Sequence, residues 1–128
     1  MKALIDANVL LWALTDHSRL SRNAAKVLDD SKHQLFFSVA GLWELVIKNQ
    51  IGKLKLPRPA GEFLKQELVD LQIPILPIEV RHVVRLESLP MHHRDPFDRV
   101  LIAQSFEEDM VIVSSDRIFK RYSVEVVW

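Results

Sequence analysis

Short hydrophobic runs along the chain alternate with segments in which apolar residues recur every three or four positions. Residues 2–5 and 34–37 are rich in strand-forming side chains, and a helix-like pattern follows each of them. This alternation is typical of βα units, so it predicts a parallel sheet.

The helix after the second strand has both a start signal and an apolar stripe. Ser38 is a suitable N-cap, and Leu42, Leu45 and Val46 fall at positions i, i+3 and i+4. We expect this helix to run to about Gln50.

The middle of the chain is broken by Gly52 and two prolines, after which a second helical stripe begins. That stripe consists of Leu64, Leu68 and Leu71. Residues 73–78 are typical of a strand, but Pro74 and Pro77 lack backbone donors and place it at an edge of the sheet. Apolar residues from Val80 onward predict a further short helix.

The clearest helix start lies at Asp95 and Pro96, which suit an N-cap and a first helical position. This helix should reach about Glu107. Residues 110–114 then predict a buried strand, and residues 122–128 a final short one.

The order of elements predicts an α/β fold, an α/β/α sandwich with helices on both faces of a mainly parallel sheet. At 128 residues, 48% of them hydrophobic, we expect one domain over residues 1–128. Ligands of such sheets bind at the carboxyl ends of the strands.

Composition limits the cellular setting and the metal chemistry. The chain has no cysteine, which excludes disulfides and thiolate metal sites and suits a reducing cytoplasm. The longest apolar run, residues 9–14, is too short for a membrane span, and Asp6 and Asn8 interrupt the first hydrophobic run, unlike a secretory signal. We therefore expect a cytoplasmic protein without membrane contact.

Four acidic residues far apart in sequence are expected at one edge of the sheet. Asp6 ends the first strand and Asp116 follows the 110–114 strand, while Asp98 lies in the first turn of the intervening helix. Glu44, on an apolar helix face, could reach the same crevice.

Each acid also has an ordinary explanation. Glu44 could pair with Lys48 at i+4, Asp95 could only cap its helix, and the other acids could serve turns or helix starts. If the carboxylates do converge, repulsion would be roughly 4 kcal/mol per pair at about 4 Å. A divalent cation would remove it, and carboxylate oxygens suit Mg²⁺ or Mn²⁺, two of which could clamp the attacking water and leaving oxygen of a phosphodiester.

In order along the chain, these residues resemble the motifs of PIN-domain nucleases. The resemblance lies in Leu4-Ile5-Asp6-Ala7-Asn8-Val9-Leu10, Trp43-Glu44-Leu45, Asp95-Pro96-Phe97-Asp98-Arg99 with Leu101-Ile102-Ala103-Gln104, and Ser114-Ser115-Asp116 with Phe119. The form His93 to Arg99 is similar to the VapC group, the toxin halves of bacterial type II toxin–antitoxin pairs.

The resemblance implies a Mg²⁺-dependent endoribonuclease whose catalytic and metal-binding acids are Asp6, Glu44, Asp98 and Asp116, with Asp95 as a fifth metal ligand. It implies an RNA substrate, a cognate antitoxin protein and a homodimer. Ser114 would be a polar support, and Asn8, Arg99 and Ser114 are the candidates for substrate binding. The first motif has Asn8 where many members have Thr or Ser near this position, and Asn8 can still orient a water or a metal ligand.

Several basic, histidine and tryptophan residues each allow a functional and a structural interpretation. Arg99, with Arg94, Lys48, Lys120 and Arg121, could form a basic rim for the RNA backbone or be ordinary surface charges. His92 and His93 could contact phosphate or lie in a solvated loop. Trp12 and Trp43 could belong to the core or to a groove for an antitoxin helix.

Two rival functions stay open. A phosphohydrolase would use Asp6 as a nucleophile, although such enzymes of the haloacid dehalogenase type have a second Asp where this chain has Asn8. A non-catalytic binding module would keep the acids for folding or for a partner. The formal net charge is zero, from 17 basic and 17 acidic residues, so any RNA binding must be local.

Overall fold

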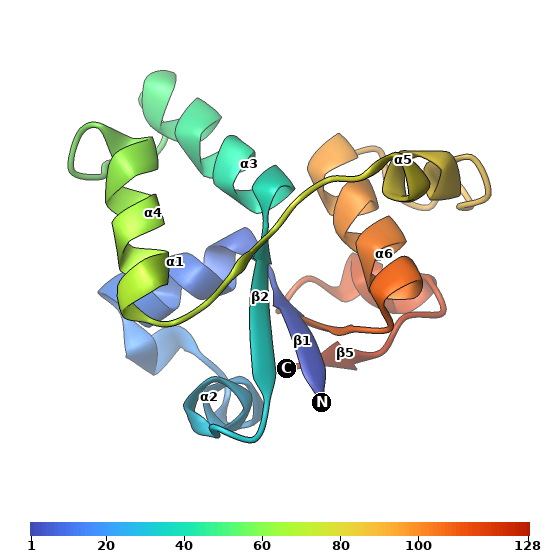
Figure 1. Ribbon diagram of the computed structural model, residues 1–128, viewed down its shortest axis with the longest axis horizontal. Helices are drawn as coiled ribbons and strands as arrows, with labels where there is room; N and C mark the ends of the chain where they lie inside the picture. The colour runs from blue at the N-terminus through green and yellow to red at the C-terminus, as the bar shows by residue number, and fades with distance from the viewer.

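All five strands of the chain run parallel in one sheet, with the order β3-β2-β1-β4-β5. Figure 1 labels three of them, β2, β1 and β5. The structure is a computed structural model that describes residues 1–128. The strands are β1 (Lys2–Ile5), β2 (Gln34–Ser38), β3 (Ile75–Leu76), β4 (Val111–Val113) and β5 (Val126–Val127). In the central register, Leu4 pairs with Phe36 on one side and with Ile112 on the other.

Six α-helices cover the two faces of the sheet. They are α1 (Ala7–Thr15), α2 (Arg22–Asp29), α3 (Val39–Gln50), α4 (Ala60–Asp70), α5 (Val80–Leu86) and α6 (Pro96–Glu108). Short 3-10 helices span His17–Arg19 and Arg117–Arg121. The longest helix, α6, has 13 residues, so none of the helices could span a membrane.

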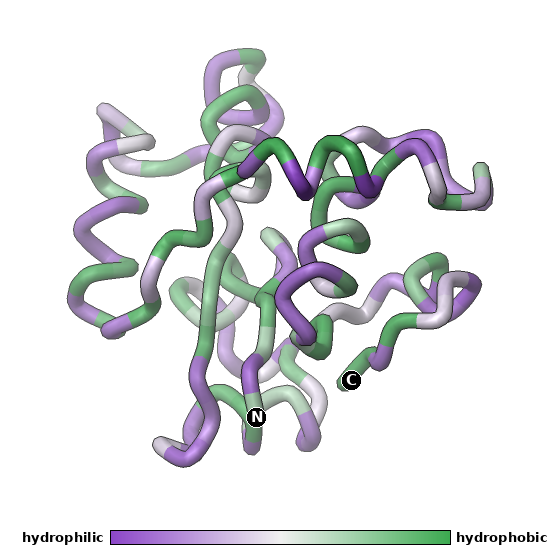
Figure 2. The backbone as a smooth tube through the Cα atoms, turned by 45° about the vertical axis from the view of Figure 1, so that its right-hand side comes forward, coloured by the Kyte–Doolittle hydropathy of each residue, from purple (hydrophilic) through white to green (hydrophobic).

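Alternate residues of the strands enter two separate cores. Ala3 and Ile5 of β1 pack into a cluster with residues of α1 to α4, whereas Leu4 packs with residues of α6 on the opposite face. Figure 1 shows this division, with α1, α2, α3 and α4 on one side of β1 and β2, and α5 and α6 on the other. In Figure 2 the helices alternate between hydrophobic and hydrophilic segments, as expected for helices with one buried face. The predicted α/β/α sandwich is confirmed.

Two predicted helix starts form for the local reasons given by the sequence. Ser38 Oγ accepts the N–H of Ala40 at 3.0 Å at the start of α3. Asp95 Oδ1 accepts the N–H of Phe97 at 2.9 Å, and Pro96 occupies the first turn of α6. These caps satisfy backbone donors that have no partner inside the helix.

The edges of the sheet differ from the sequence-based expectation. The strand predicted over residues 73–78 is reduced to Ile75–Leu76, because Pro74 and Pro77 flank it and cannot donate to a neighbour. The last strand is limited to Val126–Val127. Leu71, expected on the buried stripe of its helix, instead follows α4 and is exposed.

Candidate active site

Asp6 and Ser114 join the carboxyl ends of the two central strands β1 and β4. The N–H of Asp6 donates to the carbonyl of Val113 at 3.0 Å, continuing the pairing of the strands beyond their ends. Asp6 Oδ1 accepts the N–H of Ala7 at 2.8 Å, which caps α1, and Ser114 Oγ donates to Asp6 Oδ2 at 2.7 Å. The first acid is thus buried and held from both sides.

Asp116 is tied to the same hydroxyl. Its N–H donates to Ser114 Oγ at 3.0 Å, and its Oδ1 accepts the N–H of Ile118 at 3.0 Å, where it caps a 3-10 helix. The side chain of Asp116 remains exposed, so its second oxygen is free to bind a ligand.

Asp98 lies in the first turn of α6 and has a histidine partner. His93 Nε2 is 2.6 Å from Asp98 Oδ2. The N–H of Arg94 donates to His93 Nδ1 at 3.1 Å, so in the neutral ring Nε2 carries the proton and donates to Asp98. From the sequence, His93 is expected to contact phosphate or to lie in a solvated loop, and its position five residues before Asp98, across a helix cap, does not predict this pair.

Glu44 reaches the site from α3 together with Lys48. The Lys48 ammonium lies 2.7 Å from Glu44 Oε2, and the Glu44 side chain is 14% exposed. The i,i+4 ion pair considered from the sequence is therefore present. The pair also brings a cation near the other acids. The hydrogen bond to Glu44 is the largest cause of the raised pKa of Lys48, and the charges of Asp95 and Asp6 raise this pKa as well.

The electrostatics show that the carboxylates interact. Burial, with smaller contributions from Glu44 and Asp116, raises the pKa of Asp6 to about 6 against the hydrogen bonds from Ser114 and Ala7. Burial, then Asp6, raises the pKa of Asp98 to about 7, with smaller contributions from Asp95 and Glu44 against the bond from His93. The structure thus brings all five expected acids to one edge of the sheet.

The donor set fits a hard divalent cation. Ligand atoms of His93, Asp98 and Asp116 lie within 4.8 Å of one another. Carboxylate oxygens dominate the surroundings, and such oxygens with water suit Mg²⁺ or Mn²⁺. Burial is the largest cause of the raised pKa values of Asp6 and Asp98, and neighbouring carboxylates add to it. A bound cation would stabilise both groups in their ionised form.

Arg99 has other partners than those expected of an RNA-binding rim. Its guanidinium donates to the carbonyls of Pro90 at 3.0 Å and Leu86 at 3.3 Å, and lies 3.4 Å from the hydroxyl of Tyr122. That hydroxyl also accepts the N–H of His93 at 2.9 Å. Arg99 and Tyr122 therefore fix the loop that presents His93 to Asp98.

The remaining substrate-binding candidate, Asn8, is exposed in the first turn of α1, two residues after Asp6. Its side chain makes no hydrogen bond within the chain, so its amide can meet a ligand.

The two tryptophans considered for a partner groove have different neighbours. Trp12 packs against Trp128 with ring centroids 5.7 Å apart, and the Arg19 guanidinium lies over its ring. Trp43 contacts Phe97 beside the acids, with ring centroids 5.2 Å apart. The structure therefore places these aromatic rings in two separate contacts.

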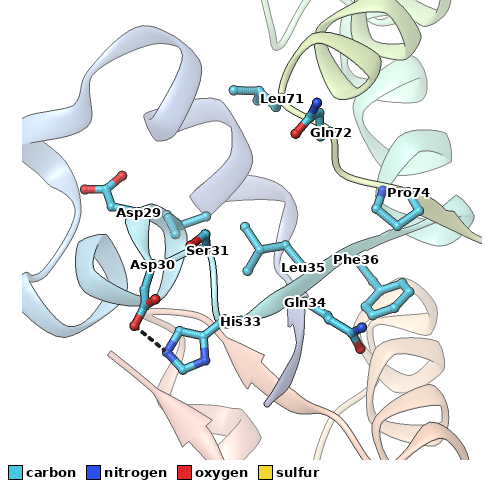
Figure 3. Close-up of a pocket in the computed structure, with 11 residues that line it drawn as sticks. Asp29, Asp30, Ser31, His33, Gln34, Leu35, Phe36, Leu71, Gln72 and Pro74 are labelled. Atoms are coloured by element: carbon cyan, nitrogen blue, oxygen red, sulfur yellow. Dashed lines mark ion pairs between the residues drawn. The ribbon is translucent and has the colours of Figure 1, made fainter.

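A hollow at the opposite edge of the sheet does not contain this chemistry. It lies between the turn that precedes β2 and the segment between α4 and β3, and Figure 3 shows His33 paired with Asp30 at its rim. Because this is the amino edge of the strands, it is not where parallel sheets hold their ligands.

Comparisons with known proteins agree with the fold and motifs. Residues 3–125 match the PIN domain family. No curated protein sequence matches the chain. Among solved structures, VapBC2 from Rickettsia felis bound to a promoter DNA fragment is similar, with a TM-score of 0.74, 16% identity, and coverage of 98% of this chain and 97% of that one.

Two further structures are similar to nearly the same extent. A DNA-bound VapBC from Salmonella typhimurium gives a TM-score of 0.72 at 10% identity, covering 98% of this chain and 96% of that one. A toxin–antitoxin complex from Klebsiella pneumoniae gives 0.68 at 16% identity with the same coverage. At these identities the structural likeness shows the fold, and the match over residues 3–125 shows the family. The chain belongs to the PIN domain family.

Proposed function

We propose that this protein is a Mg²⁺-dependent endoribonuclease and the toxin component of a type II toxin–antitoxin module. The observation that carries the proposal is the meeting of Asp6, Glu44, Asp95, Asp98 and Asp116 at the carboxyl edge of a PIN-family sheet. Such a concentration of carboxylates disfavours the folded chain unless a cation is bound there, which indicates a binding site rather than a structural cluster.

The chain's own residues have separate tasks in this mechanism. Asp6, Asp98 and Asp116 would hold Mg²⁺, or Mn²⁺, with Glu44 and Asp95 completing the acidic set, while Ser114 orients Asp6 and His93 orients Asp98. A divalent cation bound there supplies an activated water and neutralises the leaving oxygen of the phosphodiester. Lys48, paired with Glu44, adds a positive charge beside the acids.

The expected partners follow from the similar complexes. The structures from Rickettsia felis and Salmonella typhimurium are VapBC complexes, and the one from Klebsiella pneumoniae is a toxin–antitoxin complex. An antitoxin protein would silence this chain, and the resemblance to the VapC group implies that the active form is a homodimer. Light scattering of the purified chain measures its mass directly, and a monomer at micromolar concentration would contradict the dimer.

The decisive experiment is cleavage of labelled single-stranded RNA with Mg²⁺, with Mn²⁺ and with chelator. Asp6→Asn removes one negative charge with little change in shape, so it should fold normally and abolish cleavage. Asp29→Asn, an exposed position at the end of α2, is the matched control and should cut at the parental rate. Cleavage that persists in Asp6→Asn or in chelator would overturn the assignment.

The toxin role has its own test. Induced expression in a bacterial host should arrest growth, and Asp6→Asn expressed to the same level should not. Arrest by both forms would mean that growth inhibition does not depend on the acidic site.

The geometry disfavours a phosphohydrolase with Asp6 as the nucleophile. Asp6 is 7% exposed, and Asn8 lies where such enzymes of the haloacid dehalogenase type have a second Asp. Trapping a phospho-aspartate with a phosphate analogue would reverse this conclusion. A binding module that holds no metal predicts no change in melting temperature on addition of Mg²⁺ or Mn²⁺, whereas the nuclease should be stabilised.

A further inference from the structure

Trp43 is the one aromatic residue of the chain that is mostly exposed. Its side chain is 57% exposed, whereas every Phe, the Tyr and the other two Trp residues are buried or half-buried. Its one aromatic neighbour is Phe97, which meets it nearly edge-to-face at 88°, with ring centroids 5.2 Å apart. This contact supports the indole while leaving most of it open to solvent.

The exposed ring lies beside the acidic site. Trp43 directly precedes Glu44 on α3, and Phe97 directly precedes Asp98 on α6. Glu44 and Asp98 are close enough for Glu44 to raise the pKa of Asp98. The aromatic pair and the acid pair therefore span the same junction between α3 and α6. The N–H of Phe97 donates to Asp95 Oδ1 at 2.9 Å, so the residue that supports the indole is held next to the acids.

Charge alone provides little attraction for a nucleic acid. The chain has 17 basic and 17 acidic residues. Lys48 is paired with Glu44, and the Arg99 guanidinium is bonded to the carbonyls of Pro90 and Leu86. The five carboxylates repel phosphates unless a cation is bound, and stacking of a base on an aromatic ring is a source of affinity for RNA that does not depend on charge.

We propose that Trp43 is a stacking platform for an unpaired nucleobase next to the phosphodiester held at the acids. This inference rests on the proposed ribonuclease function and specifies its substrate as single-stranded RNA or an RNA loop, because a base inside a duplex is stacked on its neighbours. Stacking tolerates any base, so Trp43 contributes affinity and position rather than sequence preference.

Binding of a fluorescein-labelled single-stranded RNA, followed by anisotropy with Ca²⁺ in place of Mg²⁺, tests the platform without cleavage. Trp43→Ala should weaken binding roughly tenfold to a hundredfold, and Trp43→Phe should retain most of the affinity. The control is Val69→Ala, which removes an exposed apolar side chain on a different helix, α4, and should bind RNA as the parent does. With Mg²⁺, Trp43→Ala should raise KM by a similar factor and leave kcat within about twofold.

A second RNA locates the stacked base. An oligonucleotide that lacks one base beside the cleaved bond should bind the parent protein as weakly as intact RNA binds Trp43→Ala, and the two changes together should add little. Additive losses would place the base elsewhere and overturn the inference.

Other outcomes separate this inference from the nuclease assignment. Unchanged RNA affinity in Trp43→Ala, with cleavage intact, would refute the platform and leave the ribonuclease standing. A parent protein that neither binds nor cuts RNA would refute both. If Trp43→Ala instead lowers the mass measured by light scattering and leaves RNA affinity unchanged, the ring belongs to a contact between protein chains.

Discussion

The Ser114 hydroxyl donates to Asp6 Oδ2 at 2.7 Å across 108 residues of sequence, and it joins the ends of β1 and β4. The same oxygen accepts the N–H of Asp116 at 3.0 Å. One side chain that is 1% exposed therefore sets the positions of two acids. Because its bond to Asp6 favours the ionised carboxylate, it opposes the effect of burial on the pKa of that acid.

Replacing Ser114 by Ala should impair both stability and activity. Asp6 Oδ2 and the N–H of Asp116 would lose their partner, which should lower the free energy of unfolding by about 1–3 kcal/mol. Cleavage or metal affinity should fall roughly tenfold to a hundredfold, as for other residues that orient metal ligands. Ser115→Ala, at the exposed neighbouring position, is the control. Urea unfolding and RNA cleavage measure the two effects, and equal behaviour of both variants would remove Ser114 from the site.

Much of the fold could be predicted because its signals are local. The alternation of Ala3, Leu4 and Ile5 between two cores follows from a strand buried on both faces. The caps at Ser38 and Asp95 involve partners two residues away, so they are visible in the sequence. The positions of Asp6 and Asp116 followed from strand ends, since parallel strands present their carboxyl ends on one edge.

The parts that could not be predicted depend on contacts between distant segments. Arg99 carries no sequence feature that distinguishes an RNA contact from a bond to the carbonyl of Leu86, 13 residues away. Nothing near His93 in the sequence indicates Tyr122, which lies 29 residues along the chain and whose hydroxyl accepts the N–H of His93. Trp12 and Trp43 both follow strands in the sequence, but the packing gives them different partners.

The metal-free protein should become more stable as the pH falls from about 8 to about 5. The folded-state pKa of Asp6 is raised from 3.8 to about 6, and that of Asp98 to about 7, so the folded chain binds protons that the unfolded chain does not. The ionised carboxylates lower the stability of the folded chain. This free-energy penalty is fully present above the folded-state pKa values, is relieved as the pH falls through them, and is gone below the unfolded pKa near 4. For Asp6 it is on the order of 3 kcal/mol.

Urea unfolding in chelator at pH 8, 7, 6 and 5 measures this dependence. Asp6→Asn with Asp98→Asn removes both groups, so the double variant should be more stable than the parent at pH 8 and should lose most of the difference at pH 5. A constant difference between the two proteins over this range would show that the acids are not protonated on folding. With Mg²⁺ present, the parent's preference for low pH should diminish, since protons and the cation compete for the same oxygens.

Arg99→Lys should loosen the loop before α6 although the charge is retained. The guanidinium reaches the carbonyls of Leu86 and Pro90 and the Tyr122 hydroxyl together, and a single ammonium lacks the planar set of donors for this. We expect faster amide exchange over residues 87–93 and a loss of about 1–3 kcal/mol in unfolding free energy. Arg94→Lys, at an exposed position in the same loop, is the control. Unchanged exchange in Arg99→Lys would mean that Tyr122 alone holds the loop.

Gly41 and Gly61 should respond in opposite ways to alanine, although both lie within helices. A Cβ at Gly41 of α3 would lie 2.7 Å from Cζ of Phe37, whose ring is fully buried and cannot move aside. A Cβ at Gly61 of α4 would meet only a methyl of Val46 at 3.6 Å, an ordinary contact. Gly41→Ala should therefore destabilise the fold by about 1–3 kcal/mol through overpacking, and Gly61→Ala should be neutral or stabilise it by up to about 1 kcal/mol.

Because Phe37 packs where α3 leaves the sheet and Glu44 lies one turn further along α3, Gly41→Ala should also slow RNA cleavage. Thermal melts of the two variants decide the first point, and a Gly41→Ala protein as stable as the parent would mean that α3, and Glu44 with it, can shift without penalty.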